Sequence, residues 1–235
     1  MPVKTSASRD GTSPGATPAN APDAAIAVRN LSVVLARRPL FSGLDLSLAR
    51  GRKLTLRGPS GSGKSTFLHC LLGFVRPAGG SIRICGQELD GDSVWRLRAR
   101  MAYVPQEPAW APGRVSDILS RPFSFKINRQ LRDRLDRIPE LMDDLRLPAH
   151  LLNQETARLS GGERQRLALL AALLLEREIL LLDEATAALD QETSQAVIRL
   201  LREKGPPTII AISHDRDGLG PEAETFYLGN AGAGK

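Results

Sequence analysis

Hydrophobic and polar positions alternate along residues 26–57, which read IAVRNLSVVLARRPLFSGLDLSLARGRKLTLR. A period of two places successive side chains on opposite faces of a strand. The segment therefore predicts short β-strands, with a turn at Gly51. A second strand-like patch, SIRICGQEL at 81–89, follows a pair of glycines.

The apolar spacing becomes helical between about residues 107 and 170. Six apolar residues recur at helical spacing on one face: Leu131, Leu135, Ile138, Leu141, Met142 and Leu145. We expect this stripe to face the core, on one helix or on two helices jointed at Pro139. None of the six side chains has catalytic chemistry, so the stripe is interpreted as packing.

Two nearly continuous apolar runs follow, ILLLD at 179–183 and TIIAIS at 208–213. Parallel strands that are covered on both faces have this composition. Because strands alternate with helical segments around these runs, the pattern predicts an α/β fold interrupted by a helical insertion.

The two ends of the chain differ from the middle. Residues 1–25 are rich in Ser, Thr, Pro, Gly and Ala and lack the apolar block of a secretory signal, so we expect a disordered arm. The closing GNAGAGK, 229–235, is predicted to be a flexible tail.

Composition limits which partners and which compartment the sequence predicts. The net charge is +6, but the arginines alternate with acids, as in RDRLDR at 132–137, so a solvated surface is expected rather than nucleic-acid binding. The longest apolar run, LALLAALLL at 167–175, is shorter than the roughly 18 residues of a membrane span, so no direct membrane insertion is expected. The only cysteines, Cys70 and Cys85, lack CxxC spacing and are interpreted as free thiols in a reducing compartment.

Residues 58–66, GPSGSGKST, match the phosphate-loop pattern G-x-x-x-x-G-K-[ST] between a strand-like and a helix-like segment. The glycines let backbone N–H groups curl around phosphate oxygens. Lys64 would contact the β- and γ-phosphates, and the Ser65 hydroxyl would complete a Mg²⁺ shell. The predicted nucleotide-binding residues of the loop are Gly58, Pro59, Ser60, Gly61, Ser62, Gly63, Lys64, Ser65 and Thr66.

Polar residues end the other strand-like runs. RMAYVPQ ends in Gln106, ILLLD ends in Asp183 and is followed by Glu184, and TIIAIS is followed by His214. Ligands bind beyond the carboxyl ends of parallel strands, so these residues should converge on the phosphate loop. Asp183 is expected to hold Mg²⁺ and Glu184 to accept a proton from the attacking water. His69 and His150 lack such a setting and are interpreted as structural.

The stretch LSGGERQR at 159–166 predicts a second helix start built for an anion. A phosphate held by the first loop does not need two cradles from one chain. A two-fold dimer, in which the turn of each chain covers the nucleotide of the other, resolves this redundancy.

These residues resemble the ATP-binding subunit of an ABC transporter over about residues 26–228. The resemblance rests on GPSGSGKST, YVPQ, LSGGERQR, ILLLDEAT, AALD and ISHD, in the family's order and spacing. It implies a P-loop NTPase (RecA-like) parallel-sheet core with an antiparallel β subdomain, and a helical subdomain at about 107–170 that docks on a transmembrane permease. It also implies ATP and Mg²⁺ as cofactors, a homodimer that sandwiches two nucleotides, and a cytoplasmic protein, peripheral on the inner membrane.

The resemblance also assigns roles to residues. Gln106 becomes the residue that contacts metal and water, Glu184 the catalytic glutamate and His214 the switch histidine, while Ser65 and Asp183 become metal ligands. Five residues would contact the partner's nucleotide: Ser160, Gly161, Gly162, Glu163 and Asp190. Leu35 stands where many members have an aromatic residue that stacks on adenine, which predicts weaker or less selective nucleotide binding.

Within the family, residues 108–128 resemble small ATPases of iron-export systems, which makes a metal ion such as iron the expected cargo. Two alternatives to a transport ATPase remain open. One is a DNA-associated ATPase, although no heptad repeat marks the coiled coil that such proteins insert. The other is a regulatory module that binds ATP without turnover, which Glu184 and His214 argue against.

Overall fold

A computed structural model describes residues 24–203, 208–213 and 218–229. Most of the predicted arm, the predicted switch residue His214 and the end of the predicted tail lie outside the described residues. The first strand begins at Ala24, two residues before the predicted start of the folded domain.

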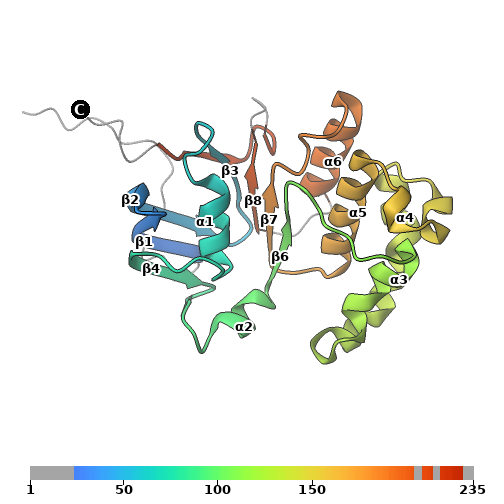
Figure 1. Ribbon diagram of the computed structural model, residues 1–235, viewed down its shortest axis with the longest axis horizontal. Helices are drawn as coiled ribbons and strands as arrows, with labels where there is room; N and C mark the ends of the chain where they lie inside the picture. The colour runs from blue at the N-terminus through green and yellow to red at the C-terminus, as the bar shows by residue number, and fades with distance from the viewer. Residues whose placement is uncertain (1–23, 204–207, 214–217, 230–235) are drawn as a thin grey trace, which may run out of the picture.

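The described strands form two sheets (Figure 1). An antiparallel sheet has the order β2-β1-β4-β5, and a parallel sheet has the order β6-β7-β8-β3-β9. The strands are β1 (Ala24–Leu35), β2 (Arg38–Ala49), β3 (Lys53–Arg57), β4 (Gly79–Ile84), β5 (Gln87–Glu88), β6 (Met101–Val104), β7 (Ile179–Asp183), β8 (Thr208–Ile212) and β9 (Glu224–Tyr227). The predicted α/β class with a parallel sheet is confirmed.

The first hairpin is longer than its alternating pattern predicted. Strands β1 and β2 each have 12 residues instead of forming several short strands. They are joined by Ala36 and Arg37, which both adopt positive φ angles, of 48° and 64°. Two such residues form the tight turn that matches the twist of paired strands, although neither is the glycine that usually marks it. The predicted turn at Gly51 is present, with φ 77°.

Helices cover both faces of the parallel sheet. Leu180 and Leu182 of β7 pack in a core shared with the helices α5 (Gly161–Leu174) and α6 (Gln191–Glu203). Ile179 and Leu181, which alternate with them, pack in a second core, shared with α1 (Lys64–Leu71) and the antiparallel sheet. Burial on both faces explains why this strand reads as a continuous apolar run.

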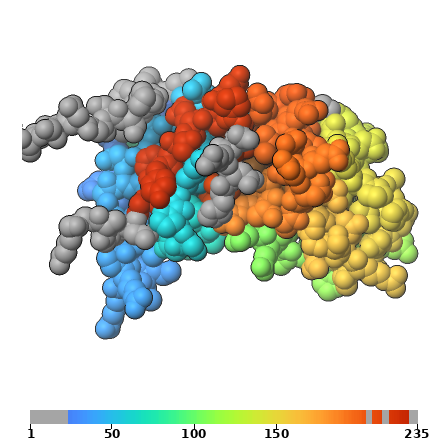
Figure 2. All heavy atoms as spheres, turned by 90° about the horizontal axis from the view of Figure 1, so that it is seen from above, coloured from blue at the N-terminus to red at the C-terminus, as the bar shows by residue number. Residues whose placement is uncertain are grey.

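The helical segment lies at the end of the molecule opposite the antiparallel sheet (Figures 1 and 2). Its elements are α3 (Val115–Ser120), η1 (Arg121–Ser124), η2 (Lys126–Arg137), α4 (Ile138–Asp144), η3 (Ala149–Asn153), η4 (Thr156–Arg158) and α5. A short α2 (Val94–Arg98) precedes β6. The last of these helices, α5, ends at Leu174, four residues beyond the predicted end of the subdomain at about 170. The range of about 107–170 for the subdomain stays a prediction.

The predicted apolar stripe does face the core. Leu141, Met142 and Leu145 are buried, and the other three leucine and isoleucine residues of the stripe pack against the same core from partly buried positions. The first half of the stripe, η2, is 3₁₀ rather than α-helical. Pro139 lies in the first turn of α4, where its missing N–H breaks no helical hydrogen bond, so the helix boundary falls just before it.

Candidate nucleotide site

The loop between β3 and α1 is shaped by its glycines. Gly58 has φ 151°, and a Cβ atom there would come within 2.2 Å of the Leu228 carbonyl oxygen. Gly61 and Gly63 adopt φ angles of 75° and 93°. L residues rarely adopt these angles, so the glycines are needed for the backbone to curl. The predicted loop is therefore present at the start of α1.

The loop presents donors that fit a phosphate. The Lys64 side chain is only 7% exposed, and its Nζ donates to the carbonyl oxygens of Gly58 and Pro59, at 2.9 and 3.0 Å. The Ser62 hydroxyl is buried and has no hydrogen-bond partner among the described residues. A buried polar atom without a partner is uncommon in native proteins. Together with the uncapped start of α1, it fits a loop that receives an anion.

Asp183 brings a carboxylate beside this loop. It ends β7 and is 4% exposed. The Ser65 hydroxyl donates to its Oδ1 at 3.0 Å, and the Tyr103 hydroxyl donates to its Oδ2 at 3.2 Å. A hydroxyl and a carboxylate are oxygen ligands that suit Mg²⁺, which is usually bound by one or two carboxylates together with substrate phosphates and water. In the described part of the chain, no group of three or more His, Cys, Asp or Glu is placed to hold a metal ion.

Glu184 and Gln106 lie together at the same edge. Gln106 Nε2 donates to Glu184 Oε2 at 3.0 Å, so the two predicted residues from neighbouring strands do converge. Glu184 adopts φ 48°, which a non-glycine residue seldom does. Leu35, the predicted adenine neighbour, ends β1 and is 53% exposed.

Two residues reach this site that the sequence reasoning did not assign to it. His69 Nε2 lies 3.2 Å from the Tyr103 hydroxyl, which in turn contacts Asp183. His69, interpreted from the sequence as structural, is thus linked to Asp183 through the Tyr103 hydroxyl. A signal was available, because His69 is four residues after Ser65 and shares its face of α1.

The second anion turn begins α5 with a complete capping box. Glu163 N donates to Ser160 Oγ at 3.3 Å, and Ser160 N donates to Glu163 Oε2 at 2.8 Å. Ser160 N and Ser160 Oγ both donate to Glu163 Oε2, each at 2.8 Å, and these two hydrogen bonds lower the pKa of Glu163 below its usual range. Ser160 and Gly161 are exposed, so the turn is open to a partner.

Asp190, also predicted to face the partner, has a local role. It accepts hydrogen bonds from Thr193 N at 2.9 Å and Thr193 Oγ1 at 2.7 Å, at the start of α6. These two hydrogen bonds lower the pKa of Asp190. A Cβ atom on Gly162 would lie 3.7 Å from the Leu189 side chain. The LSGGERQR turn and the AALD turn are therefore neighbours in the fold.

The two anion turns of the chain belong to opposite faces of the parallel sheet. The side chains of α1 pack in the core with the antiparallel sheet, whereas those of α5 pack in the core with α6. Figure 1 shows α1 and α5 on the two sides of β6 and β7. The turn at Ser160 is thus not arranged as a second wall of its own chain's phosphate loop.

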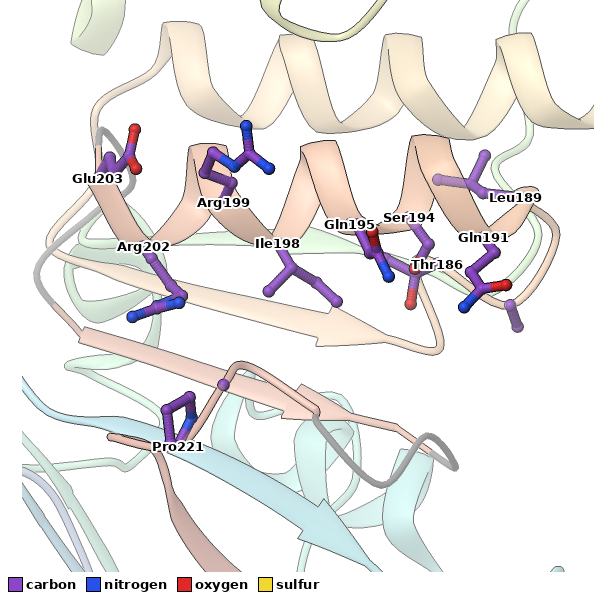
Figure 3. Close-up of a pocket in the computed structure, with 12 residues that line it drawn as sticks. Thr186, Leu189, Gln191, Ser194, Gln195, Ile198, Arg199, Arg202, Glu203 and Pro221 are labelled. Carbon is purple, nitrogen blue, oxygen red and sulfur yellow. The ribbon is translucent and has the colours of Figure 1, made fainter.

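An open groove runs along α6 (Figure 3). Its walls include Ile198 and Arg202 of α6, Pro221 opposite them, and Thr186 and Leu189 at one end. No residue of the phosphate loop lines it. The groove therefore adjoins the AALD turn and is not the nucleotide site.

Comparison with known proteins agrees with the motifs. Residues 41–187 match the family model described as ABC transporter. The methionine import ATP-binding protein MetN of Brucella abortus is 36% identical over 184 residues, which cover 75% of this chain and 49% of MetN. Among curated relatives, the matched segment spans from 14% to 66% of the relative's own length.

Solved structures share the architecture. A bacterial Atm1-family ABC exporter with ATP bound superimposes with a TM-score of 0.76 at 27% identity, over 92% of this chain and 40% of the exporter. A dimeric bacterial ABC transporter cassette superimposes with a TM-score of 0.75 at 25% identity, over 88% of this chain and 95% of the cassette. Within the described residues of this chain, no helix has the length and apolar character needed to cross a bilayer.

Proposed function

The chain belongs to the ABC transporter family, and we propose that it binds and hydrolyses ATP as the subunit that energises a separate transmembrane permease. The observation that carries this proposal is the convergence at one edge of the parallel sheet. The phosphate loop lies at this edge, and two hydrogen bonds of 3.0 Å link predicted site residues there. One joins Ser65 to Asp183, and the other joins Gln106 to Glu184.

Each group has a chemical role in this proposal. Lys64 and the backbone of the phosphate loop bind the β- and γ-phosphates. Ser65 and Asp183 hold Mg²⁺, with Gln106 as a further oxygen ligand. When bound, Mg²⁺ neutralises charge that develops on the phosphates. Glu184 accepts the proton of the attacking water, Gln106 orients that water, and His214 contacts the γ-phosphate.

The second anion turn supports a homodimer as the working unit. Since α1 and α5 lie on opposite faces of the sheet, the exposed Ser160 turn is free to cover the nucleotide of a second copy. Ser160, Gly161 and Gly162 would donate to the γ-phosphate in trans, with Glu163 and Asp190 beside them. ATP shared by two chains stabilises the closed dimer, and hydrolysis releases it.

Closure and opening would move the helical subdomains and, with them, a bound permease. In this proposal the chain works on the cytoplasmic face of the inner membrane, held there by its partner. The named relatives include an import protein and an exporter. A metal ion such as iron stays the predicted cargo, on the resemblance of residues 108–128 alone.

Substitution of Glu184 tests the proposal. We expect Glu184→Gln to bind ATP and form a dimer, and to release phosphate at least about 100-fold more slowly, since a general base contributes about 10²–10⁴-fold. Phosphate release and size-exclusion chromatography with ATP and Mg²⁺ measure both. Glu107→Gln, a neighbouring exposed carboxylate, is the matched control and should retain turnover.

Three results would count against the proposal. Full turnover by Glu184→Gln would remove the assigned base. Absence of phosphate release from wild type in the presence of its permease would favour the regulatory module. A salt-dependent shift of DNA, with turnover stimulated by DNA, would favour the DNA-associated ATPase.

A further inference from the structure

A chain of hydrogen bonds runs behind the metal carboxylate. Tyr103 of β6 donates its hydroxyl hydrogen to Asp183 Oδ2 at 3.2 Å, and its oxygen lies 3.2 Å from His69 Nε2 of α1. The His69 and Tyr103 rings pack edge to face, with centroids 5.7 Å apart. The rings of His69 and Phe74 also pack edge to face, with centroids 6.1 Å apart. The aromatic contacts fix both rings.

The topology of the sheet produces this chain. Tyr103 pairs with Leu181 in the parallel ladder of β6 and β7, so both point to the same face of the sheet. Asp183 is two residues after Leu181 and points to that face as well. Ser65 and His69, one turn apart on α1, cover that face. Each oxygen of the carboxylate therefore has its own hydroxyl donor.

The direction of the hydrogen bonds follows from their chemistry. A carboxylate only accepts, so the single hydrogen of the Tyr103 hydroxyl is committed to Asp183. The phenol oxygen must then accept, which makes His69 Nε2–H the donor.

We propose that Tyr103 is a positioning residue for the metal carboxylate Asp183, and that His69 orients Tyr103. The proposal rests on the assignment of Asp183 as a ligand of the nucleotide-bound Mg²⁺. With Oδ2 held by Tyr103, Oδ1 stays beside the Ser65 hydroxyl, and the two ligand oxygens are held together before the metal arrives. Loss of such a partner typically weakens metal binding about 10–100-fold.

The test uses the full-length chain with ADP and Mn²⁺, a paramagnetic substitute for Mg²⁺. Tyr103→Phe removes one oxygen and retains the ring. Tyr227→Phe, the chain's other tyrosine and 67% exposed, is the matched control. Electron paramagnetic resonance measures the Mn²⁺ concentration that half-saturates the ADP-bound protein, and calorimetry measures ADP affinity in EDTA.

We expect Tyr103→Phe to raise the half-saturating Mn²⁺ concentration about tenfold, with ADP affinity in EDTA unchanged. His69→Leu should produce a smaller rise, and His69→Gln, which retains an N–H donor, should restore most of it. A change in folding alone would weaken ADP binding in EDTA as well. Tyr227→Phe should match wild type.

Two outcomes overturn the proposal. A Tyr103→Phe titration that superimposes on wild type, or one shifted to lower Mn²⁺, shows that the hydroxyl does not position the carboxylate. Equal loss of ADP affinity with and without metal assigns Tyr103 to packing. If wild type itself binds neither ADP nor Mn²⁺ with ADP, the proposed function fails first, and this inference fails with it.

Discussion

Glu184 has an unusual backbone conformation and accepts a hydrogen bond from Gln106. Its φ of 48° lies in a region that costs a non-glycine residue on the order of 1 kcal/mol or more. The residue before it, Asp183, still belongs to β7. The sharp change of direction sends the two consecutive carboxylates to different partners, Ser65 and Tyr103 for Asp183 and Gln106 for Glu184. Two adjacent acids can thus hold separate roles.

The side chain at position 35 is predicted to affect how tightly the base of the nucleotide binds. Leu35 is 53% exposed at the end of β1, so a larger side chain there meets solvent rather than the core. We expect Leu35→Tyr to bind ATP roughly tenfold more tightly, because stacking of a base on an aromatic ring contributes about 1–3 kcal/mol. Titrations of ATP and GTP measure affinity and selectivity. Val34→Tyr, 52% exposed on the adjacent position, is the control, and equal affinities for wild type and Leu35→Tyr would remove the hypothesis.

At the scale of elements, three segments are joined at the amino ends of the parallel strands, away from the nucleotide edge. Arg100, just before β6, donates to both carboxylate oxygens of Glu178, just before β7, at 2.7 and 2.6 Å. Arg50, at the end of β2, donates to the same carboxylate at 3.2 Å. The ion pairs therefore tie the antiparallel sheet to the parallel one.

This cluster makes stability depend on pH. The hydrogen bonds and charge of Arg100 lower the pKa of Glu178. A lowered carboxyl pKa stabilises the fold above the ordinary glutamate value of about 4.3, and that contribution is lost as the pH falls through the lowered pKa. We expect Arg100→Met to reduce the free energy of unfolding by about 1 kcal/mol at pH 7, a value kept small because Glu178 is 45% exposed.

The difference between Arg100→Met and wild type should shrink as the pH falls below about 4, as measured by urea unfolding. Arg98→Met is the control, because the Arg98 side chain donates to the neutral backbone carbonyl oxygens of Leu72 and Gly73. A deficit in Arg100→Met that is the same at pH 7 and pH 3 would assign the loss to packing of the arginine stem.

The elements that the sequence predicted best are those whose pattern is local. The runs at 179–183 and 208–213 became β7 and β8, and the glycines of 58–63 formed the expected loop. The first hairpin turns at Ala36 and Arg37, which are not usual turn residues, and η2 is a 3₁₀ helix although its apolar spacing is that of an α-helix. The link from His69 to Asp183 passes through Tyr103, and only the spacing of His69 four residues after Ser65 could be read locally, because the contacts with Tyr103 and Asp183 depend on the packing of α1 on the sheet.

At the scale of the whole molecule, the fold separates the two anion turns of the chain. The phosphate loop leads into α1 on one face of the parallel sheet, and the exposed turn at Ser160 leads into α5 on the other. A single chain therefore has a phosphate-binding loop and a separate exposed turn at Ser160. In two copies related by two-fold symmetry, the Ser160 turn of each chain can cover the phosphate loop of the other. Dimer formation with ATP, rather than ATP binding alone, is therefore the property to measure.

Ser160→Arg tests this arrangement in the Glu184→Gln background, where ATP is retained. We expect the variant to bind ATP as tightly as its parent and to remain monomeric on size exclusion with ATP and Mg²⁺, because the long side chain would occupy the space of the partner's nucleotide. The substitution also removes the cap of α5, which costs about 1 kcal/mol of stability. Ser160→Ala loses the same cap without added bulk, so it should dimerise at least partly. Loss of ATP binding together with dimerisation in Ser160→Arg, but not in Ser160→Ala, would mean that the turn contacts the nucleotide of its own chain.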